Sequence, residues 1–346
     1  MAAAGLRPRE GSLMGAVMSA AKPASRPVVS RRSPWRSLIV VGAVTVVGCF
    51  LPWVLTSSFY LSLLINGVLL GIAAVGIGFL MHQCGLVMFG VAAFIGLPAY
   101  LLGIFTTHLG IGLAWAVPLA LLVSTAFAAL SGALVVRARP LPFAMLTLAL
   151  AQMLKSMSTL QVMRPVTGGD DGLTMTFTGS FLGLSQAGLA KASTFWPLAW
   201  VALCLVMWLL WSAAHSRFGQ VLRATQANEE RMRFSGFDTY VPRWLAFVLT
   251  SFVVSIAGVL MALHSAFASP ELLDFATGGH ALVAMLVGGG GTVGGPLLGA
   301  LLYTWGQDAF GATGYLELLT GIAVVVMIAA FPQGAMGFLL KLWRRR

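Results

Sequence analysis

Charged residues are scarce in this sequence. Asp, Glu, Lys and Arg together make up 9% of the 346 residues, whereas a soluble globular protein carries about 25%. Hydrophobic residues account for 58% of the chain. A chain of this composition cannot cover its surface with side chains that favour water, which excludes a soluble protein. The composition predicts an integral membrane protein.

Cysteine is also scarce, and several motifs are absent. The three cysteines, Cys49, Cys84 and Cys204, are scattered, and no C-x-x-C or His/Cys ligand spacing occurs. We therefore expect neither a disulfide framework nor a metal site. The pattern G-x-x-x-x-G-K-[ST] does not occur, and neither does a Gly-Lys dipeptide, so the chain has no phosphate-binding loop of its own. No convergent Ser/His/Asp set is found, and we expect no catalytic residue and no cofactor.

Acidic residues are few in comparison with basic ones. The chain carries 10 acidic and 21 basic residues, which gives a formal net charge of +11. Most of the basic residues fall in 1–36, at Arg137 and Arg139, in and beside 215–242, and in 341–346. Basic segments beside apolar spans are cytoplasmic by the positive-inside rule. The positive charge therefore indicates topology and not a nucleic-acid partner.

Long apolar runs fill most of the remaining sequence. A spanning helix needs about 20 mostly apolar residues. The runs that meet this length are 37–57, 59–81, 112–136, 140–162, 196–214, 243–268 and 314–338. Two more runs, 85–108 and 277–307, are apolar but interrupted by Gly and Pro. We predict an all-α, polytopic helical bundle of about eight to ten spans. Because each broken run follows an apolar helix, one in each half of the chain, an internal repeat is also expected.

The ends of the chain differ from its centre. We expect a disordered basic cytoplasmic tail over 1–36, a transmembrane domain over 37–340 and a basic cytoplasmic C-terminus over 341–346. An organelle transit peptide is the alternative for the tail, since such peptides are rich in Arg and Ser and poor in acids.

The parity of crossings places the two long polar loops on opposite sides of the membrane. The loop 163–195 should be external and the loop 215–242 cytoplasmic, since only the second is strongly basic. The same parity requires 277–310 to cross twice or not at all. This segment is therefore either two short half-helices or a re-entrant hairpin, and we expect a helix broken at its glycines.

The stretch MLVGGGGTVGGPLLGA, residues 285–300, contains G-x-G-x-x-G at Gly289, Gly291 and Gly294. A dinucleotide-binding turn with this pattern follows a strand and opens a helix, but here the pattern lies in an uncharged apolar run. The same glycines have the spacing that lets helices approach closely in lipid, and Gly295 with Pro296 offers a break. We predict a membrane hinge or packing site and no nucleotide site.

The basic loop has a helical pattern. No Gly or Pro occurs from 220 to 234, Glu229 and Arg233 have the favourable i,i+4 order, and Gly236 provides a stop. A partial apolar face is formed by Val221, Leu222, Thr225 and Met232. Two interpretations stay open: a short helix that docks on a partner protein, and a solvated loop with no partner.

Five stretches, in this order along the chain, resemble the permeases of branched-chain amino acid ABC transporters, in particular the LivM-type subunit. They are GLVMFGVAAFIGLPAYLLG, RARPLPFAMLTLALAQ, TGGDDGLT, SRFGQVLRATQANEERMRFSGF and MLVGGGGTVGGPLLGA. The resemblance covers about residues 60 to 335. It departs from the family pattern at Gln220, where Arg is usual, at Gln152, where an acidic residue is common, and at the prolines of RARPLPF.

The resemblance implies a permease subunit of an ABC importer in a cell inner membrane. Such a subunit pairs with a second permease, as a heterodimer, and with two cytoplasmic ATPase subunits and an external solute-binding protein. The substrate implied is a branched-chain amino acid. Urea, short amides and sugars, which related permeases carry, stay open as alternatives.

The resemblance also implies roles for individual residues. The ATPase-coupling helix would include Phe218, Gly219, Arg223, Ala227, Asn228, Glu229 and Gly236. The translocation path and its packing would involve Phe94, Tyr100, Gly289, Gly291, Gly295 and Pro296. An external turn that faces the mouth of the path would contain Thr167, Gly168, Gly169, Asp170 and Asp171. Gly and Asp are also favoured in turns for backbone reasons alone, and we favour this structural interpretation of the external residues.

An ion-coupled secondary transporter is the main alternative function. Charges within or beside the apolar spans are few, namely Lys155, Asp308 and Glu317. A charge inside a span is a functional hypothesis by default, but Lys155 and Glu317 lie near predicted helix ends, where a long side chain can reach the interface. No series of intramembrane acids resembles a proton relay, which disfavours this alternative.

Overall fold

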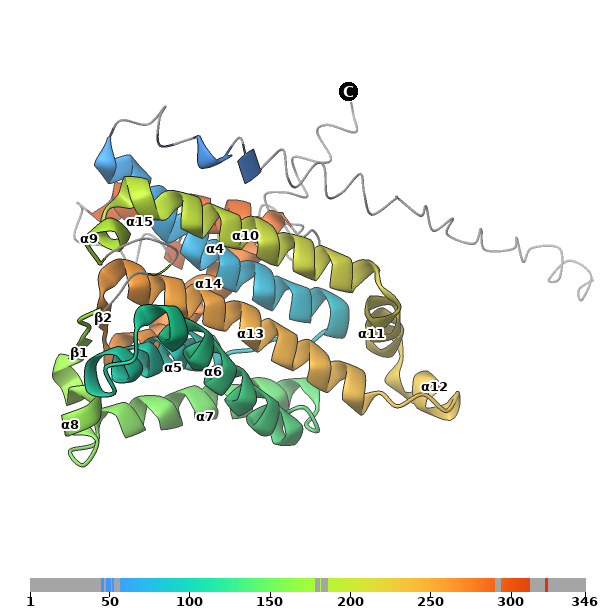
Figure 1. Cartoon of the computed structure of the whole chain (residues 1–346). Coiled ribbons are helices and arrows are strands. Elements are labelled where there is room, and N and C mark those ends of the chain that lie inside the picture. Colours follow the sequence, from blue (N-terminus) through green and yellow to red (C-terminus); the bar gives the residue numbers. More distant parts are fainter. Residues whose placement is uncertain are drawn as a thin grey trace, which may run out of the picture. The chain divides into compact units, whose positions relative to one another are not determined.

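The computed structural model describes residues 45, 46, 48–50, 52, 57–177, 181, 186–289, 294–311, 321 and 322. The predicted tails 1–36 and 341–346 lie outside these residues, as do most of the predicted spans 37–57 and 314–338. Within the described part the chain is a bundle of helices with a single short pair of strands (Figure 1).

Six helices in the described part are long and apolar enough to cross a bilayer. They are α4 (Ser58–Cys84), α5 (Val91–Gly103) with its π-helical extension η1 (Ile104–His108), α6 (Leu113–Val135), α7 (Pro140–Thr159), α10 (Ala192–His215) and α13 (Tyr240–Ser265). The prediction of a polytopic all-α membrane protein is thus confirmed. The broken run 85–108 contributes one of these helices, and its first residues are not helical.

Shorter elements connect and cover the long helices. They are α8 (Arg164–Thr167), η2 (Gly169–Asp171), β1 (Leu173–Thr174), α9 (Gln186–Ala190), α11 (Arg217–Ala227), α12 (Glu229–Phe234), β2 (Phe267–Ala268), η3 (Pro270–Leu273), α14 (Phe275–Gly288) and α15 (Gly295–Gly311). Strands β1 and β2 pair antiparallel, with Leu173 opposite Ala268. This ribbon ties the 163–195 loop to the residues that follow α13. It lies at the opposite end of the bundle from α11 and α12 (Figure 1).

Helix α4 forms the centre of the bundle. In its most apolar stretch of 18 residues, 83% of the residues are buried, compared with 28% in α7 and 33% in both α6 and α10. The peripheral helices expose large apolar side chains such as Trp115 and Leu141. Exposed apolar side chains on a peripheral helix suit contact with lipid or with another membrane subunit.

Close helix contacts depend on glycine. A Cβ at Gly258 of α13 would collide with the backbone of Ile95 in α5, so these two helices touch backbone to backbone. Small residues allow this approach where lipid provides no hydrophobic driving force between helices.

The glycine-rich run 285–300 contains the end of α14 and the start of α15, which together form a helical hairpin. A Cβ at Gly288 would collide with Gly295, a Cβ at Gly299 would collide with Ala284, and the rings of His280 and Tyr303 lie 5.5 Å apart. These pairs show that α14 and α15 run antiparallel. The expected break at the glycines is therefore present, and the preceding element is a helix and not a strand, as the rejection of a nucleotide site required.

Helix α15 packs along α4 through three further glycines. Gly67 and Gly71 of α4 face Leu301 and Leu297, and Gly78 faces Pro296. At the turn, Gly289 has a φ of +92°, a conformation that favours glycine. Gly291, which we assigned to the translocation path, lies outside the described residues.

Candidate functional site

The segment α11–α12 begins with a sharp turn from α10. Ser216 caps α11, and its side chain accepts a hydrogen bond from the backbone N–H of Gly219 at 3.4 Å. A Cβ at position 219 would collide with the carbonyl oxygen of Ala214, so glycine allows α11 to fold back against the end of α10. Leu222, fully buried, and Thr225 form the inner face of α11. Leu222 and Thr225 of the predicted apolar face thus pack α11 against the bundle.

Arg223 links α11 to the ends of two long helices. Its Nη1 donates to the carbonyl oxygen of Ala214 in α10 at 3.0 Å and to Oε1 of Gln83 in α4 at 3.3 Å. Gln226, one turn along, lies against Gly85, and its Nε2 is 3.5 Å from the carbonyl oxygen of Met81. The guanidinium of Arg223 therefore positions α11 against the two long helices. The sequence pattern of the loop did not predict this role.

The helical pattern from 220 to 234 corresponds to parts of two helices and not to one continuous helix. The helix breaks at Asn228, where φ is −162° and ψ is 99°, and a second helix, α12, starts at Glu229. The side chain of Asn228 accepts a hydrogen bond from the backbone N–H of Arg231 at 2.9 Å, and Glu229 and Glu230 occupy the first turn. An Asn cap and acids at a helix N-terminus are both stabilising. Both effects require a helix N-terminus, so neither would stabilise the segment if the helix continued through Asn228.

We expect Asn228→Ala to destabilise α12 by about 1 kcal/mol, because the cap is lost. Hydrogen exchange of the α12 amides should then be about fivefold faster, while exchange in α13 stays the same. Asn228→Asp keeps the acceptor oxygen and serves as the control. Equal exchange rates in the alanine and aspartate variants would show that the cap does not hold α12.

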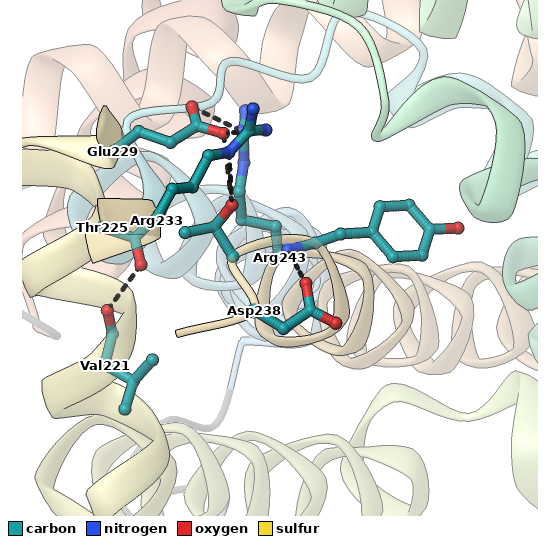
Figure 2. A network of polar contacts seen from close by, with 8 residues as sticks. Val221, Thr225, Glu229, Arg233, Asp238 and Arg243 are labelled. Carbon is teal, nitrogen blue, oxygen red and sulfur yellow. Dashed lines mark hydrogen bonds and ion pairs between the residues drawn. The ribbon is translucent and has the colours of Figure 1, made fainter. Parts of the chain in front are cut away.

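Glu229 is the centre of a polar network (Figure 2). One carboxylate oxygen pairs with Arg233 at 2.8 Å, and the other pairs with Arg243, in the first turn of α13, at 2.9 Å. The hydroxyl of Thr239 donates to Glu229 at 3.3 Å and accepts from Nε of Arg233 at 3.2 Å. The predicted i,i+4 pair of Glu229 and Arg233 is confirmed.

Arg243 belongs to this network, although the sequence did not identify it as a functional residue. It is buried, although arginine is rarely buried unless it is paired. The only feature of the sequence that points to Arg243 is its position as a basic residue at the start of an apolar run. Through Glu229, Arg243 fixes α12 to α13, the helix that crosses the bundle to the β1–β2 ribbon.

The end of α12 forms a Schellman motif. The N–H of Phe237 bonds to the carbonyl oxygen of Met232 and the N–H of Gly236 bonds to that of Arg233, with a φ of +81° at Gly236. This pattern stops a helix at glycine, as predicted. It leaves Phe234 92% exposed and Phe237 54% exposed. We call these two side chains the α12 aromatic surface.

At the opposite end of the bundle, residues 167–172 form a tight turn. Gly168, Gly169 and Gly172 all have positive φ, and the side chain of Asp171 pairs with Arg164 at 3.1 Å. The hydroxyl of Thr167 donates to the carbonyl oxygen of Ser158 at the end of α7, at 2.7 Å. Backbone geometry accounts for these glycines. Asp170 is exposed.

The residues assigned to the translocation path lie in different environments. Phe94 is fully buried, and its ring is edge-on to that of Phe247 at 5.7 Å, so it packs the core. Tyr100 lines a cavity between α5 and α7. Gly295 contacts Gly288 of α14, and Pro296 faces Gly78 of α4. The residues that sequence assigned to function therefore fall mainly in three separate places: the α11–α12 segment, the α14–α15 hairpin and the turn at 167–172.

One ion pair lies near the β1–β2 end. Nζ of Lys155 in α7 is 3.0 Å from a carboxylate oxygen of Asp274, which caps α14. The hydrogen bond from Lys155 lowers the pKa of Asp274 below its ordinary value, since it favours the charged carboxylate. Among the described residues no group of three or more His, Cys, Asp or Glu side chains has the arrangement of a metal site.

Comparison with known proteins identifies the family. The family model described as branched-chain amino acid transport system, permease component, matches residues 59–331. The chain is 26% identical over 284 residues to the high-affinity branched-chain amino acid transport system permease protein LivM of Salmonella typhimurium, and 25% identical to LivM of Escherichia coli K12. These alignments cover 76% of this chain and 66% of each LivM protein.

A second kind of permease is also similar. LivH of Escherichia coli K12 is 25% identical over 173 residues, which cover 49% of this chain and 56% of LivH. No solved structure has significant similarity to the chain. The match to the family model spans most of the sequence and all six long helices, and the chain therefore belongs to the family of permease components of branched-chain amino acid transport systems.

Proposed function

We propose that this chain is a transmembrane permease subunit of an ABC importer in a cell inner membrane. ATP hydrolysis takes place on two cytoplasmic ATPase subunits, because the sequence contains no phosphate-binding loop. The α12 end of the bundle faces the cytoplasm, where the positive-inside rule places its arginines. The β1–β2 end faces an external solute-binding protein.

The observation that carries this proposal is the α12 aromatic surface. Phe234 ends α12 and Phe237 follows the turn after it, and a cap, a Schellman motif and an ion-pair network hold this helix in place. Exposed aromatic side chains on a rigid support are typical anchors of protein interfaces. A partner that covers Phe234 and Phe237 can transmit a displacement to α13 through Glu229 and Arg243. We propose that the ATPase subunit is this partner and that α11–α12 is the coupling segment.

The proposed substrate is a branched-chain amino acid, as the names of the LivM and LivH relatives suggest. The similarity to both kinds of relative supports pairing with a second, different permease subunit. The exposed apolar faces of α6 and α7 supply surface for that contact. Transport by this pair would proceed by alternating access, with closure of the ATPases as the driving step.

The proposal is tested by reconstitution in liposomes with the ATPase subunits, the second permease and the binding protein. Uptake of leucine should require ATP and all of these components. Uptake by the two permeases alone under an ion gradient would contradict the proposal and favour a secondary transporter.

Replacing Phe234 by serine should weaken binding of the ATPase subunit at least about tenfold, which corresponds to about 1.4 kcal/mol. The thermal stability of the permease should change little, because the ring is 92% exposed. Val162→Ser is the matched control, since Val162 is 83% exposed at the opposite end of the chain's helical bundle. Unchanged ATPase binding in Phe234→Ser would exclude the α12 aromatic surface as the docking site.

A further inference from the structure

The chain between α4 and α5 is not helical. Residues 85–90 follow the end of α4 at Cys84 and precede the start of α5 at Val91. Gly85 lies against Gln226 of α11. This connection therefore starts at the α11–α12 end of the bundle, which faces the cytoplasm in the proposed topology.

The other end of the connection lies inside the bundle. The backbone N–H of Gly90 donates to Oγ1 of Thr147 in α7 at 3.3 Å. Thr147 is seven residues from Pro140, the first residue of α7, which is about 10 Å at 1.5 Å per residue. Helix α7 has 20 residues, the length that spans a hydrocarbon core of about 30 Å. The chain thus reaches about a third of the way across the membrane before α5 begins.

The backbone of residues 86–89, which we call the unwound segment, is unpaired. Among the described residues, no hydrogen bond joins an N–H or C=O group of this segment to another group. The side chains of Leu86 and Met88 are buried, whereas Val87 is partly exposed and Phe89 is 38% exposed. Non-helical backbone at membrane depth is tolerated only where it is buried in protein or lines a water-filled space. The open side of the unwound segment therefore requires a polar neighbour, which lipid does not supply.

Polar side chains lie near this open side. The rings of Phe89 and Phe275 of α14 are 6.5 Å apart. Asp274, which precedes Phe275, pairs with Lys155 of α7, and these side chains are 39% and 33% exposed. Gln152 lies one turn before Lys155, about 10 Å from the end of α7, and among the described residues its partly exposed amide has no hydrogen-bond partner. Ionisable side chains within membrane spans almost always face the bundle interior or a water-filled cavity.

We infer that the unwound segment lines a water-filled path for the transported solute, together with Phe275 and Gly279 of α14 and Gln152 of α7. This inference rests on the proposed function and identifies the face of this subunit that borders the path. Gly279 lies one turn after Phe275, and no described atom outside the adjoining helix backbone lies within 4 Å of a Cβ there. The free N–H and C=O groups of the unwound segment would replace part of the hydration of a polar solute as it passes.

Hydrogen exchange tests the contact with water without any substitution. It is measured on the complex of both permeases and the ATPase subunits in nanodiscs. The amides of Val87 and Met88 should exchange at least about a hundredfold faster than those of residues 77–80, which are hydrogen-bonded within α4. An amide that contacts only lipid or a partner chain exchanges slowly, because exchange requires water. Slow exchange at 86–89 would overturn the inference.

Single cysteines test the side chains of the same face. With the three native cysteines replaced by alanine, Phe89→Cys and Gly279→Cys should react with a positively charged, membrane-impermeant thiol reagent at least about tenfold faster than Leu122→Cys. Leu122 of α6 is 65% exposed and is the matched control, because lipid or the second permease covers it. Reaction at Phe89→Cys should also reduce ATP-driven uptake at least about tenfold, since the added group occupies the path.

These measurements separate the possible failures. Labelling of Phe89→Cys and Gly279→Cys as slow as that of Leu122→Cys, or labelling of Phe89→Cys without loss of uptake, would overturn the inference. A cysteine variant that does not assemble is recognised by the loss of ATP hydrolysis, and the exchange measurement on the original protein then decides. Rapid exchange and labelling without ATP-driven uptake by the original complex would instead overturn the proposed function.

Discussion

Glu229→Gln is expected to reduce ATP-driven uptake at least about tenfold while ATP hydrolysis continues. Glu229 holds α12 to α13, because its carboxylate bonds to Arg233 and to the buried Arg243. Removing the charge leaves Arg243 without an ionic partner. Hydrogen bonds to a charged group contribute about 1.5–3 kcal/mol, so α12 would lose its fixed position relative to α13. The partner could still bind Phe234, but its movement would no longer reach α13.

The comparison of uptake with ATP hydrolysis in liposomes tests this expectation. Glu230→Gln is the matched control, because the neighbouring carboxylate is exposed and lies outside the network. The double variant Glu229→Gln with Arg243→Gln should be less impaired than the sum of the two single variants, since it leaves no buried charge unpaired. Additive effects, or uptake in Glu229→Gln equal to that in Glu230→Gln, would refute a coupling role for the network.

Gly299→Ala is expected to destabilise the permease, whereas Gly306→Ala, two turns further along α15, is not. A Cβ at position 299 would collide with the backbone of Ala284 and of Gly288. Backbone atoms cannot move aside as a flexible side chain can, so the α14–α15 hairpin would have to open. Overpacking of this kind costs about 1–3 kcal/mol. Uptake should fall with stability, since α15 also packs along α4.

Gly306→Ala provides the control on the same helix. Among the described residues, no atom outside the adjoining helix backbone lies within 4 Å of a Cβ at position 306, and alanine favours a helix by up to about 1 kcal/mol over glycine. Thermal unfolding in detergent should therefore show a lower midpoint for Gly299→Ala and an unchanged or higher midpoint for Gly306→Ala. Similar shifts in both variants would mean that helix propensity, and not close packing, decides the effect.

Long apolar runs and local capping signals predicted the described helices of this protein well. The hydrophobic runs identify all six long helices, and the i,i+4 order of Glu229 and Arg233 and the stop at Gly236 predict the form of α12. The break at Asn228 also had a local signal, an Asn followed by two acids. We interpreted these residues as the interior of one helix, because no Gly or Pro interrupts the segment.

Contacts between distant parts of the chain could not be predicted in this way. Arg243 had no visible partner, since Glu229 belongs to another element and only the turn at Gly236 brings the two together. Lys155 was interpreted as a side chain that reaches the membrane interface, whereas Asp274 pairs with it from the N-terminus of α14. Such pairs depend on the packing of helices, which a single sequence does not specify.

The contact between α13 and α5 at Gly258 gives α13 the geometry of a lever with unequal arms. At 1.5 Å per residue, Arg243 lies about 22 Å from this contact and the end of the helix at Ser265 about 10 Å. If α13 tilts about Gly258, a displacement of about 2 Å at Arg243 becomes about 1 Å at the β1–β2 ribbon. A reduced displacement is accompanied by a larger force. A movement imposed at α12 would therefore reach the ribbon with a smaller displacement and a larger force.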